Sequence, residues 1–179
     1  MNVVLRKMRA DDMEMVRNWR MRPDITKYMY TDPKITIEQQ MQWFEMVSNR
    51  DDLYWIVVQD GQPVGLASLT EWDKKNSRIT GGAYIAEKNN DTFKLAIDIQ
   101  LNLLNYAFNT LNINKVCGEV ISENVGVVKI LEICGCVREG LFREHVSKNG
   151  RYYDVVVLGT IKSDWDKIKK RLKNVYEME

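Results

Sequence analysis

The side chains that most often carry covalent or metal chemistry are few in this sequence. It has one histidine, His145, and three cysteines, Cys117, Cys134 and Cys136. A serine hydrolase and a cysteine protease each need an imidazole beside the nucleophile, and a structural zinc site needs four nitrogen or sulfur ligands. The cysteines are odd in number and form no Cys-x-x-Cys pair, which is typical of reduced thiols. We therefore expect no metal centre, and we expect His145 to be a surface strand residue.

A pair of glycines is the second chemical signal. Gly81 and Gly82 lie inside residues 79–86, a segment otherwise typical of a β-strand. Glycine weakens a strand, so such a pair indicates either a β-bulge or a place where a ligand approaches the main chain closely. From the glycines alone both interpretations stay open.

Strands and helices alternate around this pair. Hydrophobic spacing predicts strands at residues 3–7, 53–59, 63–70, 79–86, 115–121, 137–146 and 151–160. It predicts helices at 11–20, 36–48 and 92–109, a short helix from Ser122 or Asn124 to Cys134, and a tail helix over 164–176. Asp60-Gly61 and Asn149-Gly150 favour tight hairpin turns, and Gly135 favours a helix C-cap. Thr36 and Gln39 have capping-box spacing, and residues 25–33 read as irregular. The order indicates an α/β (α+β) fold.

Composition narrows the function classes. The chain has 179 residues, 45% hydrophobic and 28% charged, with a net charge of +1. These values are typical of a single globular domain, here residues 1–179 with a helical tail at 162–179. A nearly balanced charge supplies no long-range field for nucleic acid or an anionic membrane. The apolar runs are too short to span a bilayer, and residues 1–8 lack the order of a secretory signal, so we expect a cytoplasmic protein.

The order of elements resembles a known family. With Glu123-Asn124 opening a short helix that ends at Gly135, about residues 3–161 resemble the GNAT superfamily of acetyl-CoA-dependent N-acetyltransferases. The Gly150-Arg151-Tyr152-Tyr153-Asp154 run is similar to the ribosomal-protein-acetyltransferase-like branch. The resemblance implies a mixed, mostly antiparallel sheet of seven strands, splayed between the fourth and fifth, with helices on both faces and an extra C-terminal helix.

A narrower similarity lies near the N-terminus. Arg17-Asn18-Trp19-Arg20, Pro23, Tyr28-Met29-Tyr30-Thr31 and the stretch from Ile35 to Trp43 are similar to the amino-sugar nucleotide N-acetyltransferase of pseudaminic acid biosynthesis. This similarity implies a UDP-linked amino sugar as acceptor, contacted by Arg20, Met29, Tyr30, Gln40 and Trp43. Arginine pairs well with phosphate, and flat or soft side chains stack on a base. Gln40 stands where that family often has histidine, and Met29 and Trp43 also fit core positions.

The resemblance also implies a place for acetyl-CoA. Main-chain groups of Ala83, Tyr84 and Ile85 would pair with the pantetheine, and Asn124 and Lys129 would contact the cofactor arm. The pyrophosphate would lie over the start of the 92–109 helix, at Asp91, Thr92, Phe93 and Lys94. The usual glycines are missing there, because Thr92 and Lys94 occupy their positions. Alternatively, Asp91 and Asn124 are helix caps and the lysines are solvated.

The catalytic positions of the resembling family fall on Glu119 and Ser68. The resemblance implies that Glu119 removes the amine proton and that Ser68 lies nearby; the alternatives are a solvated carboxylate and a small strand residue. Leu131 stands where the family usually has a proton-donating tyrosine, so either another group or water protonates the thiolate, or this step is slower. We expect Leu131 to be a core residue.

These observations favour one function and leave two alternatives. The favoured function is direct acetyl transfer from acetyl-CoA to a small-molecule primary amine, with a UDP-linked amino sugar as acceptor. A protein N-terminal or polyamine acetyltransferase is the first alternative, and a catalytically weak acyl-CoA-binding regulatory module is the second. A homodimer is left open, because the tail helix can cover its own domain or that of a partner.

Overall fold

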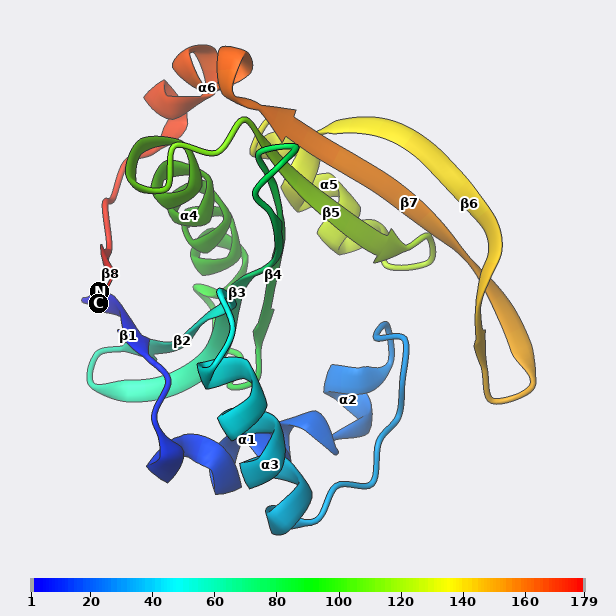
Figure 1. Cartoon of the computed structure of the whole chain (residues 1–179). Helices are drawn as coiled ribbons and strands as arrows, with labels where there is room; N and C mark the ends of the chain where they lie inside the picture. The colour runs from blue at the N-terminus through cyan, green and yellow to red at the C-terminus, as the bar shows by residue number, and fades with distance from the viewer. Residues whose placement is uncertain (1, 179) are drawn as a thin grey trace.

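A computed structural model describes residues 2–178 and contains one open sheet (Figure 1). The strands are β1 (Val3–Lys7), β2 (Leu53–Gln59), β3 (Gln62–Asp73), β4 (Arg78–Ile85), β5 (Lys115–Ile121), β6 (Val137–Lys148), β7 (Arg151–Ile161) and β8 (Glu177–Met178). Their order in the sheet is β6-β7-β5-β4-β3-β2-β1-β8. Neighbours are antiparallel except for β4–β5 and β1–β8, which are parallel. The expected mixed, mostly antiparallel sheet is confirmed, with eight strands instead of seven.

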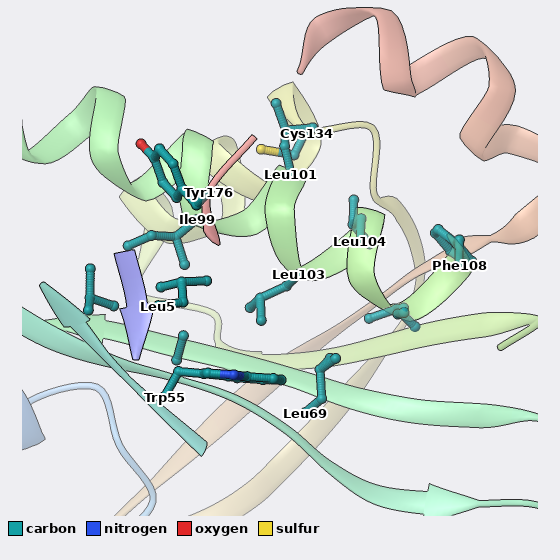
Figure 2. Close-up of a cluster of buried hydrophobic side chains, with 14 of the residues drawn as sticks. Leu5, Trp55, Leu69, Ile99, Leu101, Leu103, Leu104, Phe108, Cys134 and Tyr176 are labelled. Atoms are coloured by element: carbon teal, nitrogen blue, oxygen red, sulfur yellow. The ribbon is translucent and has the colours of Figure 1, made fainter. Parts of the chain in front are cut away.

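Helices cover both faces of the sheet, as expected. They are α1 (Met13–Arg20), α2 (Pro23–Thr26), α3 (Ile37–Ser48), α4 (Thr92–Asn105), α5 (Val125–Ile133) and α6 (Lys162–Ile168). Alternation along β2 explains the two layers: Trp55 and Val57 pack with α4, whereas Ile56 packs with α1 and α3. Figure 2 shows the first of these cores, where Leu103 of α4 lies above Trp55 of β2.

The sheet splays between β4 and β5. These two strands pair only at Arg78–Lys115, Ile79–Val116 and Thr80–Cys117. Beyond Thr80, β4 continues to Ile85 and β5 to Ile121 without pairing to each other, so the expected V-shaped opening is confirmed. Gly81 and Gly82 lie at the point of divergence and keep regular register with β3. The bulge interpretation of these glycines is therefore wrong.

Local turn signals are confirmed by the backbone. Asp60 and Gly61 have φ values of 50° and 79°, and Asn149 and Gly150 have 52° and 75°, as type I′ hairpin turns require. Gly135, with φ of 93°, ends α5. The Thr36–Gln39 capping box forms in both directions at the start of α3.

The predicted tail helix over 164–176 is confirmed only as far as Ile168 and is wrong beyond it. Helix α6 ends at Ile168, one 3₁₀ turn follows at Lys169–Arg171, and the chain then extends to β8 beside β1. Tyr176 is buried, and its hydroxyl donates to Asp98 Oδ2 at 2.9 Å. The helical spacing of the tail predicted a buried Val175, but this side chain is 72% exposed. The contact of Tyr176 with Asp98 therefore outweighs the helical periodicity. The tail therefore packs on its own chain.

Two further expectations are corrected. The helix expected over 92–109 is α-helical only to Asn105 and continues as a π turn at Tyr106–Thr110. Part of the segment read as irregular forms the short helix α2, because Pro23 suits a first helical position. Within residues 2–178, no helix is long and apolar enough to cross a membrane.

Candidate active site

A cavity of about 600 Å³ lies beside the splay. Its walls come from α1, the segment between α2 and α3, α3 itself, and strands β2 to β5. All five residues predicted to contact an acceptor line it, and so do both predicted catalytic residues: Arg20, Met29, Tyr30, Gln40, Trp43, Ser68 and Glu119. The fold thus brings residues from positions 20 to 119 into one site.

Glu119 and Tyr30 meet across the cavity wall. Glu119 is an exposed residue of β5, and its Oε2 accepts a 2.6 Å hydrogen bond from the Tyr30 hydroxyl. Burial, followed by the interaction with this carboxylate, raises the pKa of Tyr30 above its usual value. The hydroxyl therefore remains a donor at neutral pH. The sequence did not predict this partnership, because no spacing rule links two residues so far apart.

Ser68 lies on the β3 wall of the same cavity. Its hydroxyl is 3.4 Å from the main-chain oxygen of Gly82, its cross-strand neighbour on β4. A Cβ at Gly82 would lie 3.3 Å from Ser68 Oγ, so the glycine leaves room for this hydroxyl at the point where the sheet opens.

Arg20 contributes a cation to the cavity. Its guanidinium contacts the sulfur of Met29, and no carboxylate of residues 2–178 lies within ion-pair distance of it. Arg22, two residues later, is paired with both Asp24 and Glu87 outside the cavity. Arg20 is therefore available to an anionic group.

Aromatic side chains line much of the remaining surface. Trp43 packs edge-on against Tyr54, with ring centroids 5.1 Å apart, and burial raises the pKa of Tyr54 to about 12. Trp43 thus packs against its neighbours while facing the cavity. Gln40 is only 4% exposed. Tyr84 has a buried hydroxyl with no partner among the described residues.

Two aromatic positions were missed by sequence reasoning. Tyr54 was not predicted, and Tyr84 was predicted only through its main chain. Period-two alternation was the available signal, since Tyr54 pairs with Ser68 and Tyr84 with Leu66 in the sheet.

The predicted cofactor residues lie at the open end of the splay. β4 and β5 are parallel, so α4 and α5, which follow them, both begin at that end. Beyond Thr80 the edge of β4 facing β5 has no strand partner, which leaves main-chain groups of Ala83 and Ile85 for a pantetheine. The arrangement fits an extended amide chain.

Neither helix start is capped by a side chain. Asp91 and Asn124 occupy the N-cap positions of α4 and α5, but neither side chain caps its helix, so their predicted alternative role is wrong. Thr92 Oγ1 accepts a 2.8 Å hydrogen bond from the main-chain N–H of Asn89. Phe93, Lys94 and Lys129 are exposed. An uncapped helix start with nearby lysines fits an anionic phosphate.

Two remaining expectations concern Leu131 and His145. Leu131 is partly buried in a cluster with Val120, Val128, Val156 and Leu158, so its predicted core role is confirmed. His145 is exposed on β6, also as predicted, and its ring lies 6.4 Å from that of Tyr30.

Comparisons with known proteins agree with this geometry. Residues 2–137 match the family model described as an acetyltransferase (GNAT) domain. The chain is 25% identical over 169 residues to the uncharacterized N-acetyltransferase p20 of Bacillus licheniformis, covering 91% of this chain and 94% of that one. It is 26% identical over 155 residues to the spermidine N(1)-acetyltransferase of Vibrio cholerae, covering 86% of this chain and 89% of that one.

A solved structure shares the fold. The spermidine N-acetyltransferase from Vibrio cholerae, in complex with CoA and spermine, superposes with a TM-score of 0.85 at 23% identity, covering 92% of this chain and 98% of that one. With the splayed sheet, these matches establish that the chain belongs to the GNAT acetyltransferase family and is an N-acetyltransferase.

Proposed function

We propose that the chain moves the acetyl group of acetyl-CoA onto the primary amine of a small molecule bound in the cavity beside the splay. One observation carries the proposal: Glu119 and Ser68, on strands from opposite sides of the opening, face the same cavity as Arg20, Met29 and Trp43. An amine placed between them reaches a thioester lying between β4 and β5.

The cofactor site follows from the unpaired main chain. Ala83 and Ile85, on either side of Tyr84, hold the pantetheine amides, and the start of α4 from Asp91 to Lys94 holds the pyrophosphate. Asn124 and Lys129 contact the cofactor arm from α5. Bound acetyl-CoA supplies an acyl carbon activated by its thioester.

The chain's own residues handle the proton. Glu119 accepts it from the amine, directly or through one water, while Tyr30 holds the other carboxylate oxygen and Ser68 orients the nitrogen. The nitrogen bonds to the acyl carbon, the carbon–sulfur bond breaks, and the thiolate leaves. Leu131 has no proton to give, so water protonates the thiolate; a thiol is acidic enough, with a pKa of about 8.5, to leave as the anion.

For the acceptor we propose an amine that carries an anionic group at its far end, as a UDP-linked amino sugar does. The cavity has one carboxylate, Glu119, for the amine, and one guanidinium, Arg20, without a carboxylate partner. Trp43, Tyr54 and Met29 offer flat or soft surfaces for a base. A polyamine carries several positive charges, and those lying beside Arg20 would be repelled by its guanidinium.

Polyamine acetylation is nevertheless the second candidate, because a relative of 26% identity is named for spermidine. The experiment measures release of free thiol from acetyl-CoA with a UDP-linked amino sugar, spermidine and an N-terminal peptide, together with the thermal midpoint in UDP. We expect turnover with the amino sugar and a higher midpoint in UDP. Turnover with spermidine and no effect of UDP would contradict the acceptor assignment. Acetyl-CoA binding without turnover of any amine would identify a binding module.

A further inference from the structure

The loop that carries Met29 and Tyr30 has no regular structure of its own. We define the acceptor loop as residues 27–32, between the end of α2 and the approach to α3. Met29 contacts Arg20, and Tyr30 bonds Glu119, so both contacts depend on where this loop lies. A short helix and an irregular loop provide few hydrogen bonds of their own, so something else must fix their position.

The anchor is a buried lysine 122 residues after Thr26 in the sequence. The Lys148 side chain, at the tip of the β6–β7 hairpin, is only 7% exposed. Its Nζ donates to the main-chain oxygens of Thr26 at 2.6 Å, Lys27 at 3.3 Å and Met29 at 3.1 Å. It also forms a 3.0 Å ion pair with Asp32 Oδ1.

This environment is suited to an ammonium group. The three N–H donors of the ammonium have four oxygen acceptors around them. These contacts compensate the desolvation cost, which would be high for a buried charge without partners. The carbonyls of Thr26 and Lys27 lie at the end of α2, where the helix dipole favours a cation. Lys148 is therefore held by the loop's main chain as well as by one carboxylate.

Neighbouring contacts extend the same connection. Asn149 Nδ2 donates to Asp32 Oδ2 at 2.9 Å. The Thr26 hydroxyl, then Lys148, lower the pKa of Asp32 below its usual value. The hairpin itself is bent on the way to this contact, with a register shift between Phe142 and Val146 and a φ of 49° at Glu144. A straight hairpin would follow a different path, because a bulge redirects a strand.

We infer that Lys148 is a positioning residue for the acceptor: by gathering the carbonyls of Thr26, Lys27 and Met29, it holds the acceptor loop so that Tyr30 reaches Glu119 and Met29 contacts Arg20. The inference rests on the proposed function for its catalytic consequence. Its structural part, anchoring of the loop, stands on the contacts alone. Lys148 touches no reacting group, so its effect on catalysis is indirect.

The test compares Lys148→Met, which keeps the stem and removes the charge, with Lys34→Met, a matched change at an exposed lysine just beyond the loop. Hydrogen–deuterium exchange is followed over residues 26–32, and KM is measured separately for the acceptor and for acetyl-CoA. We expect Lys148→Met to speed exchange across the loop and raise the acceptor KM roughly tenfold or more, in line with loss of charge-assisted hydrogen bonds, with the KM for acetyl-CoA unchanged. Lys34→Met should change neither.

Each outcome decides a separate point. Loop exchange at the wild-type rate in Lys148→Met would overturn the inference, whatever the activity. Faster exchange with an unaltered acceptor KM would overturn the positioning role. If the wild-type protein acetylates no amine, the proposed function fails, and the exchange measurement still decides whether Lys148 anchors the loop. If Lys148→Met does not fold, Asp32→Ala replaces it. This change removes the ion pair, the Asn149 bond and the Thr26 hydroxyl contact of Asp32, while leaving the three carbonyl contacts of Lys148. It should speed loop exchange to a smaller extent, and unchanged exchange would overturn the inference.

Discussion

The hydroxyl of Tyr30 donates a 2.6 Å hydrogen bond to Oε2 of Glu119, 89 residues further along the chain. This bond joins the loop after α2 to the β5 side of the splay. It occupies one carboxylate oxygen and directs the carboxylate relative to the cavity. Because burial and the carboxylate raise the pKa of Tyr30, the phenol keeps its proton at neutral pH and remains the donor.

Replacing Glu119 by Gln should lower kcat at neutral pH far more than it raises KM. The amide keeps the shape of the side chain but cannot take a proton, and general-base catalysis contributes about 10²- to 10⁴-fold. Thiol release from acetyl-CoA at saturating amine measures the change. Glu45→Gln, an exposed residue of α3 outside the cavity, is the control. Equal kcat values for Glu119→Gln and wild type would reject the role.

Replacing Tyr30 by Phe should lower kcat by a smaller factor than Glu119→Gln. The change removes one hydrogen bond to a carboxylate, worth about 1.5–3 kcal/mol, or roughly 10- to 160-fold. The base remains, so the double variant Tyr30→Phe with Glu119→Gln should be no slower than Glu119→Gln alone. Additive losses in the double variant would show that Tyr30 acts independently of Glu119.

Replacing Arg20 by Met should raise the acceptor KM and leave the acetyl-CoA KM unchanged. A charged hydrogen bond contributes about 1.5–3 kcal/mol, so the increase for an anion-bearing amine should be about 10-fold or more. Arg22→Met serves as the control, because the guanidinium of Arg22 is paired with carboxylates outside the cavity. Faster acetylation of spermidine by Arg20→Met would instead indicate that the guanidinium repels the true acceptor class.

Two glycine variants should change stability in opposite directions. Gly135→Ala places a Cβ 2.6 Å from Ile168 Cγ1 at a φ of 93°, so it should destabilise the fold by about 1–3 kcal/mol. Gly126→Ala, within α5, meets nothing within 4 Å and should be stabilising by about 0.5–1 kcal/mol. Urea unfolding measures both. A neutral Gly135→Ala would show that α6 does not pack tightly on the end of α5.

Stability should fall in alkaline solution. Burial raises the pKa values of Tyr30, Tyr54, Tyr84 and Tyr176. Above about pH 10 the unfolded chain loses phenolic protons that the folded chain retains, so the free energy of unfolding decreases as pH rises; below pH 10 these groups contribute no pH dependence.

The urea midpoint at increasing pH measures this effect. Tyr176→Phe should flatten the alkaline decrease. It should also cost about 1 kcal/mol at neutral pH, because Asp98 loses the hydroxyl donor and keeps Asn174. A midpoint that stays constant as pH rises past the tyrosine range would contradict the assignment.

The sequence by itself determined the features that depend on neighbouring residues. Asn149-Gly150 and Asp60-Gly61 specify their turns because both positions need positive φ, and Thr36 with Gln39 specifies a helix start. Period-two and helical spacing located seven strands and the main helices. The order of elements, together with a family resemblance, indicated the opening between β4 and β5.

Tertiary structure decided what depends on distant partners. Beyond Ile168 the tail makes one 3₁₀ turn and then extends to the short strand β8, because Tyr176 gains Asp98 and Asn102 as partners, which outweighs the helical spacing that continues to Val175. Tyr30 met Glu119, and Lys148 met the carbonyls around Met29, across more than eighty residues of sequence. Local periodicity records only which face of an element is apolar. Which polar groups meet inside a cavity depends on how those elements pack.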